Sequence, residues 1–138
     1  MLITFVLVSF LLNHAFAVAL VHEVTTKVDP GAKEHFSYKS LAILLRMAHQ
    51  HFFGHGVMYF ITSAIFLFAD VADSLTILLI SALFIASWLD IVSWFGLKYH
   101  SARWEWLSIA SGTTYATAFL AMTAVILFQM WRPERAPT

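Results

Sequence analysis

The chain has 138 residues, of which 60% are hydrophobic and 12% are charged, and its formal net charge is zero. Soluble domains carry about 25% charged residues, so this composition indicates a membrane protein. A neutral chain lacks the basic surface that nucleic-acid binding requires, so we expect no nucleic-acid partner. The chain has no cysteine. This excludes disulfides, thiolate zinc sites, iron–sulfur clusters and thioether-linked haem.

Four apolar stretches predict four membrane-spanning helices, because an α-helix needs about 20 residues to cross about 30 Å of hydrocarbon. In chain order, these helices are expected over about residues 2–21, 38–69, 75–97 and 106–131. The predicted fold class is all-α: an integral membrane protein with a four-transmembrane-helix bundle. The length suits a single domain, residues 1–138.

The first stretch also has one feature of a secretory signal peptide. Ala15-Phe16-Ala17 follows the small-x-small pattern of a cleavage site. Signal peptides begin with a positively charged region, however, and no lysine or arginine precedes these apolar residues. We therefore expect a retained helix.

Candidate capping residues precede the second and third predicted helices. Ser37 or Ser40 is suited to cap the second helix, which is longer than a membrane requires. Asp73 or Ser74 is suited to cap the third.

The basic residues give an expected orientation. Most lysines and arginines lie in the connections after the first and third predicted helices, whereas the link after the second contains Asp70 and Asp73. Cytoplasmic loops are enriched in lysine and arginine. This predicts termini outside and the two long connections in the cytoplasm, although Arg132 in the C-terminal segment favours the reverse.

The unusual polar residues of all four predicted helices fall at similar depth. At 1.5 Å per residue, His14 and Asp90 each lie about 12 Å below the interface formed by the first and third connections. His51, His55 and residues 112–115 fall in the same leaflet. Ionisable residues inside a membrane are costly, usually face the bundle interior and often mark function. The sequence therefore predicts one polar site in one leaflet.

The histidine pair of the second predicted helix is suited to metal binding. His51 and His55 are four residues apart and share a helix face, which is a recurrent ligand spacing. Phe52 replaces the glutamate that zinc-protease chemistry needs. One interpretation is a bare copper, iron or zinc ion held by His51, His55, Asp90 and His14.

The other interpretation is haem b, whose iron takes two histidines from opposite sides of a flat ring. His51 or His55 would supply one ligand, and His14 or His100 the other. Arg46 is placed to pair with a haem propionate. Haem is favoured if His14 faces the second helix, and a bare metal if Asp90 does.

Residues 55–60, with the sequence HGVMYF, resemble the haem-ligating helix of haem–copper oxidase catalytic subunits, which carries H-G-x-x-M followed by aromatic residues. The resemblance covers six residues, and Met58 comes one position early. It implies haem ligation at His55 and adds weight to haem.

These observations leave several functions open. The first is a small membrane redox protein, or the membrane subunit of an electron-transfer or oxidase complex, with quinone as a candidate partner. The second is a transition-metal-binding protein or an accessory subunit of a membrane oxygenase. A proton or ion pathway and a structural accessory subunit are further alternatives. In each case we expect contact with the lipid bilayer, and other membrane subunits or further copies of the chain as partners.

Overall fold

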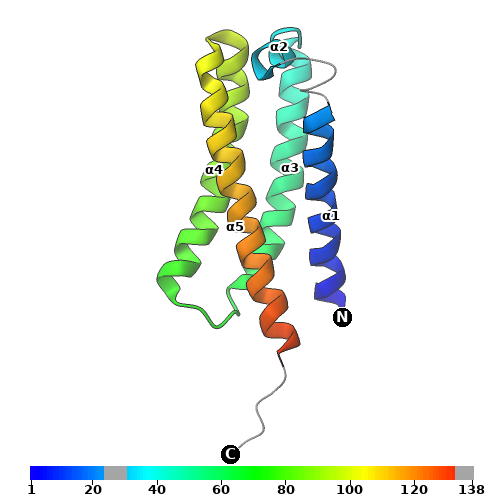
Figure 1. Cartoon of the computed structure of the whole chain (residues 1–138), viewed down its shortest axis with the longest axis vertical. Coiled ribbons are helices and arrows are strands. Elements are labelled where there is room, and N and C mark those ends of the chain that lie inside the picture. Colours follow the sequence, from blue (N-terminus) through cyan, green and yellow to red (C-terminus); the bar gives the residue numbers. More distant parts are fainter. Residues whose placement is uncertain (24–30, 133–138) are drawn as a thin grey trace, which may run out of the picture.

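The computed structural model describes residues 1–23 and 31–132, and these residues are mostly helical (Figure 1). In chain order, the elements are α1 (Leu2–Glu23), α2 (Ala32–Ser37), α3 (Leu41–Phe66), α4 (Asp73–Tyr99), the 3-10 helix η2 (Ala102–Trp104) and α5 (Glu105–Trp131). No strand occurs in the part described, which confirms the all-α prediction there. Parts of the predicted first connection and of the C-terminal segment, residues 24–30 and 133–138, lie outside the described residues.

The second long helix, α3, is shorter than the predicted span of 38–69. It begins at Leu41 because the Ser40 hydroxyl accepts a hydrogen bond from the backbone N–H of Ile43 at 3.3 Å, which satisfies a free donor at the helix start. Ser40 is therefore the cap, rather than Ser37. Residues 32–37, expected to be a connection, form α2.

The third long helix, α4, begins two residues earlier than predicted. Its N-cap residue is Ala72, and no side chain bonds to the free backbone N–H groups there. The prediction that Asp73 or Ser74 caps this helix is wrong. Asp73 is instead the first helical residue, where its negative charge is favourable beside the positive end of the helix dipole.

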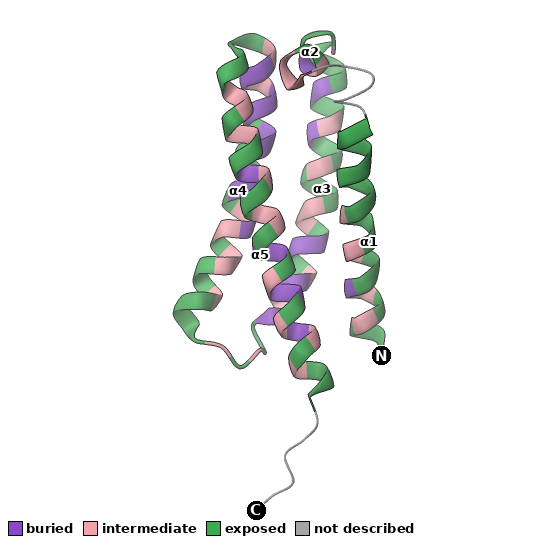
Figure 2. Cartoon of the chain, in the orientation of Figure 1, coloured by how far each residue is buried: buried purple, intermediate pink, exposed green. Residues whose placement is uncertain are grey.

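The four long helices differ in how far they are buried. α4 and α5 form the most extensive pair, and α3 packs against both. α1 lies along the outside of the bundle next to α3 (Figure 1). Figure 2 shows α1 almost entirely exposed, and Leu7 is its one buried residue. α1 is therefore the least firmly packed of the long helices.

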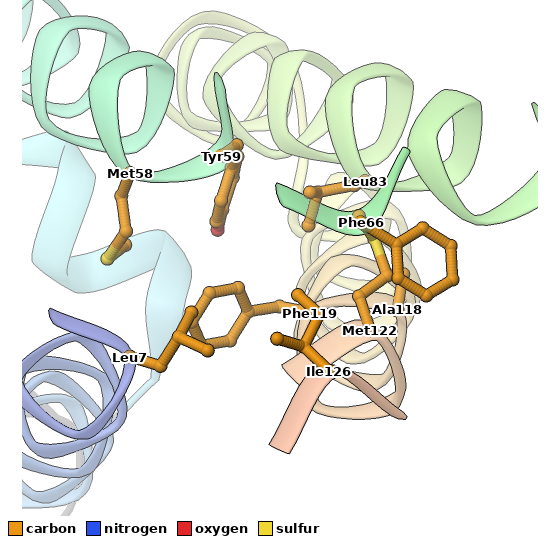
Figure 3. Close-up of a cluster of buried hydrophobic side chains, with 9 residues drawn as sticks. All are labelled: Leu7, Met58, Tyr59, Phe66, Leu83, Ala118, Phe119, Met122 and Ile126. Atoms are coloured by element: carbon orange, nitrogen blue, oxygen red, sulfur yellow. The ribbon is translucent and has the colours of Figure 1, made fainter. Parts of the chain in front are cut away.

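Two groups of apolar side chains fill the interior. The central group, shown in Figure 3, draws on all four long helices: Leu7, Met58, Tyr59, Phe66, Leu83, Ala118, Phe119, Met122 and Ile126. The second group joins α2 to α3 and α4: Phe36, Leu44, Ala48, Ile91, Trp94 and Leu97.

Two lysines connect α2 to the end of α4. Lys33 Nζ donates to the carbonyl oxygens of Leu97 and Lys98, the latter at 3.1 Å. In return, Lys98 Nζ donates to the carbonyl oxygens of Ser37, at 3.3 Å, and Lys39. The last carbonyls of a helix lack partners within it and carry partial negative charge. Each lysine therefore caps the C-terminal end of the other's helix.

Three helices in the described part of the chain are long and apolar enough to cross a membrane: Leu2–Glu23, Asp73–Tyr99 and Ala102–Trp131. α3 is long enough, with 26 residues. It is less apolar than the others because three histidines, Gln50 and Arg46 fall within it.

Candidate functional site

The structure brings His14 of α1 next to His55 of α3. The centroids of the two imidazole rings are 6.1 Å apart, and the ring planes differ by 17°. The His14 ring also stacks on the Phe119 ring of α5, and the centroids of these two rings are 4.5 Å apart. Three helices, α1, α3 and α5, therefore meet at His14.

Hydrogen bonds fix the orientation of two imidazoles. His14 Nδ1 lies 3.3 Å from the Phe10 carbonyl oxygen, and His51 Nδ1 lies 3.0 Å from that of Met47. A carbonyl oxygen accepts hydrogen bonds, so in the neutral imidazole each Nδ1 carries the proton and each Nε2 offers a lone pair as an acceptor. His14 Nε2 accepts a hydrogen bond from the Tyr59 hydroxyl at 3.4 Å. Metal-binding histidines are commonly oriented by such bonds to backbone carbonyls.

His55 lies at the centre of the cluster. Its ring centroid is 5.3 Å from that of His51, 5.1 Å from Tyr59 and 5.5 Å from Tyr115. His55 Nδ1 is buried and has no hydrogen-bond partner among the described residues. Nearly all buried polar atoms in proteins are hydrogen-bonded, so an exception needs an explanation. A group bound at His55 would provide one.

Asp90 of α4 is buried, with 7% of its surface exposed. Its carboxylate accepts a hydrogen bond from the Ser108 hydroxyl of α5 at 2.7 Å. The carboxylate also interacts with His51 and Trp94, and electrostatically with the hydroxyls of Tyr59 and Tyr115. The His51 ring meets the Trp94 indole edge-on, with centroids 4.8 Å apart. Asp90 therefore joins α4 to α5 and lies on the His51 side of the cluster.

Two predicted site residues lie elsewhere. His100 is exposed just after α4 and stacks on Trp104, with ring centroids 6.0 Å apart. Arg46 is exposed on α3. Within the part of the chain that the structure describes, His100 and Arg46 make no ring contact or hydrogen bond with His14, His51 or His55. The structure therefore brings together His14, His51 and His55, with Asp90 beside them, and leaves His100 and Arg46 outside.

The residues predicted to hold a bare metal ion come from three helices, α1, α3 and α4. Within residues 1–23 and 31–132, no three histidine, aspartate or glutamate side chains are grouped closely enough to hold a metal ion. His14, His51, His55 and Asp90 share one region, and the Asp90 carboxylate there accepts a hydrogen bond from Ser108.

Tyr59 and Ser108 contact the cluster, although the sequence pattern did not mark either of them as a site residue. Tyr59 lies four residues after His55, so the i, i+4 spacing that paired His51 with His55 also extends to Tyr59. Ser108 gave no such signal, because its bond to Asp90 joins two different helices.

Comparison with known protein families shows which family the chain resembles. Residues 29–137 match the family Aq_1264_TM, described as a transmembrane helical domain. The matched region contains α2 to α5, and α1 with His14 lies before it. No curated protein and no solved structure matches the chain.

Proposed function

The chain belongs to the Aq_1264_TM family of transmembrane helical domains, and on this premise we propose that it is a membrane electron-transfer protein that binds haem b. It is an integral membrane protein whose exposed apolar helices contact the lipid bilayer. His14 on α1 and His55 on α3 are the residues that would hold the haem iron.

The spacing of these two imidazoles carries the proposal. A haem iron held by two histidines needs them on opposite sides of the ring, usually from two helices. The centroids of His14 and His55 are 6.1 Å apart. Haem requires only these two protein ligands, whereas a bare ion requires a larger set.

The nitrogen atoms of the two rings also suit this role. His14 holds its proton on Nδ1 and presents Nε2 to the hydroxyl of Tyr59, which lies four residues after His55 on α3. An iron at Nε2 would replace the hydrogen bond from Tyr59. Beside His55, a Cβ placed on Gly54 or Gly56 would meet nothing within 4 Å, so no neighbouring helix packs closely against the backbone at these two positions.

Haem b supplies one-electron redox chemistry when it is bound. The chain would hold the iron through His14 and His55 and exclude water with the aromatic rings around them. Tyr59 and Phe119 are fully buried, and Tyr115 lies 6.5 Å from His14 between ring centroids. An apolar surround of this kind controls solvent access and so influences the reduction potential.

The proposal includes α3 as a fourth membrane span. Its outward residues include Phe52, Phe53 and Phe60, which are exposed and apolar, while His51 and His55 are partly buried against the other helices. Such an arrangement places polar groups inside a bundle and apolar groups toward lipid. We also propose that the α2 end of the bundle, which carries most of the basic residues, faces the cytoplasm.

The absorption spectrum of the detergent-purified protein tests the proposal directly. We expect a Soret band, sharp α and β bands after reduction with dithionite, and about one iron per chain by elemental analysis, because one histidine pair holds one haem. A spectrum without haem, from cells supplied with haem precursor, would contradict it. Stoichiometric copper, zinc or non-haem iron in that sample would favour a metal-binding protein.

A second candidate, a proton pathway, is favoured by the continuity of the polar groups. Asp90 bonds to Ser108 and interacts with His51, whose ring contacts that of His55. From His55 the series continues through Tyr59 to His14. Chains of aspartate and histidine within membranes are typical of proton relays.

Replacement of Asp90 by asparagine separates the two candidates. Asparagine keeps an oxygen that accepts the Ser108 hydrogen bond but removes the ionisable group. We expect haem content within twofold of the unaltered protein, because Asp90 is not an iron ligand. In a proton pathway, flux into proteoliposomes, followed with a pH-sensitive dye, would fall at least tenfold.

The matched control is Asp70→Asn, which changes an exposed aspartate beyond the end of α3. If both asparagine variants conduct protons as the unaltered protein does, Asp90 is no part of a relay. If Asp90→Asn alone loses its haem, the assignment of His14 and His55 as sufficient ligands is contradicted.

A further inference from the structure

The short helix α2 lies across one end of the bundle, beside the start of α3 and the end of α4 (Figure 1). One aromatic side chain anchors it there. Phe36 is buried and stacks on Trp94 of α4, with ring centroids 5.6 Å apart and planes within 18°. The chain thus inserts an apolar ring from α2 into the end of the bundle.

A continuous series of ring contacts connects Phe36 to the histidine cluster. Trp94, which Phe36 covers, contacts the His51 ring, and His51 contacts His55. Asp90 lies one helical turn before Trp94 and interacts with it. Phe36 and Trp94 therefore separate the polar groups of the site from the surface at the α2 end.

Charge holds α2 in this position. The ammonium groups of Lys33 and Lys98 bond to carbonyl oxygens at the ends of α4 and α2, so the contact is reciprocal. Hydrogen bonds from a charged donor are stronger than those between neutral groups. The lysines and Phe36 act on the same short helix from different sides.

We infer that α2 is a plug that closes the membrane-surface end of the histidine site and that Lys33 and Lys98 hold it shut. Water and small water-soluble solutes reach His51 and Asp90 from this end only when Phe36 leaves Trp94. The plug concerns the site on which the proposed function rests, but it does not depend on haem, and its test needs none.

The chain contains no cysteine, so one introduced cysteine reports accessibility without background. Ala48 of α3 is buried in the apolar group beneath α2, and Ala48→Cys is a small change there. In the full-length protein in detergent, we expect a charged maleimide to label this cysteine slowly. Adding Phe36→Ala, or Lys33→Met with Lys98→Met, should raise the labelling rate at least tenfold, measured by mass spectrometry.

Two further cysteines serve as controls. His49→Cys lies next to Ala48 but is exposed, so it should react quickly in every background. Ala118→Cys is buried in the central group away from α2, so it should stay unreactive unless the whole bundle unfolds. If Phe36→Ala makes Ala118→Cys reactive as well, that variant has loosened the whole bundle. The test then rests on Lys33→Met with Lys98→Met, because this double variant leaves the apolar contacts intact.

The inference is overturned if Ala48→Cys already reacts as fast as His49→Cys, since the end would then be open. It is also overturned if the lysine pair leaves the labelling rate of Ala48→Cys unchanged. If the purified unaltered protein contains no haem but the cysteines label as expected, the proposed function is contradicted and the inference that α2 is a plug still stands.

Discussion

Replacement of either His14 or His55 by alanine is expected to remove haem from the protein, lowering the haem-to-protein ratio at least tenfold. Each histidine would supply one of the two iron ligands, and a haem held from one side dissociates far more readily. Neither side chain belongs to the central apolar group, so the bundle should still insert and fold. The measurement is the reduced-minus-oxidised spectrum of each variant, with helical content from circular dichroism.

His49→Ala and His100→Ala are the matched controls. His49 is exposed on the same helix as His55, and His100 is exposed beyond α4, so both variants should keep their haem. If His100→Ala loses its haem and His14→Ala keeps it, then His100, and not His14, is the ligand that pairs with His55. Retention in both His51→Ala and His55→Ala would place the cofactor outside this cluster altogether.

Gly96→Ala is expected to cause the largest loss of stability among single glycine replacements. A Cβ at this position would overlap Cγ, Cδ2 and Cε3 of the Trp104 ring, which belongs to η2 and is packed against α4. A rigid indole cannot yield as a flexible side chain would. Overpacking of this kind costs about 1–3 kcal/mol. Thermal unfolding in detergent, followed by circular dichroism, should show a clearly lower midpoint.

Gly54→Ala and Gly112→Ala provide the comparison. A Cβ at either position meets nothing within 4 Å. Alanine favours helix over glycine by about 1 kcal/mol, so these variants should be equally or more stable than the unaltered protein. A Gly96→Ala midpoint as high as theirs would mean that Trp104 can move away from α4.

The contrast between these glycines shows which packing constraints the sequence cannot predict. Gly54 lies beside His55, and Gly112 lies among the polar residues of the last predicted helix, so both are close to the predicted site in sequence. Gly96 gave no such signal, since its neighbour Trp104 follows only after the turn between α4 and α5. Close packing between helices depends on how the helices are placed, and no local pattern encodes that.

The connection before α3 shows the same limit. Residues 32–37 contain charged and polar side chains, and their sequence is typical of a loop. They form α2 because Phe36 packs on Trp94 and because Lys98, about sixty residues away in sequence, bonds to carbonyls at the end of the helix. A six-residue helix is unstable alone, so tertiary contacts decide whether it forms.

The sequence by itself determined that the chain is helical and suited to a membrane, and it placed His14, His51, His55 and Asp90 at a common depth. Composition, the length of the apolar stretches and a fixed rise per residue are sufficient for that. Only the tertiary structure decided which of these residues meet: His14 faces His55 and Tyr59, while Asp90 bonds to Ser108. Membrane helices are apolar on nearly every side, so periodicity leaves their relative rotation open, and packing between helices fixes it.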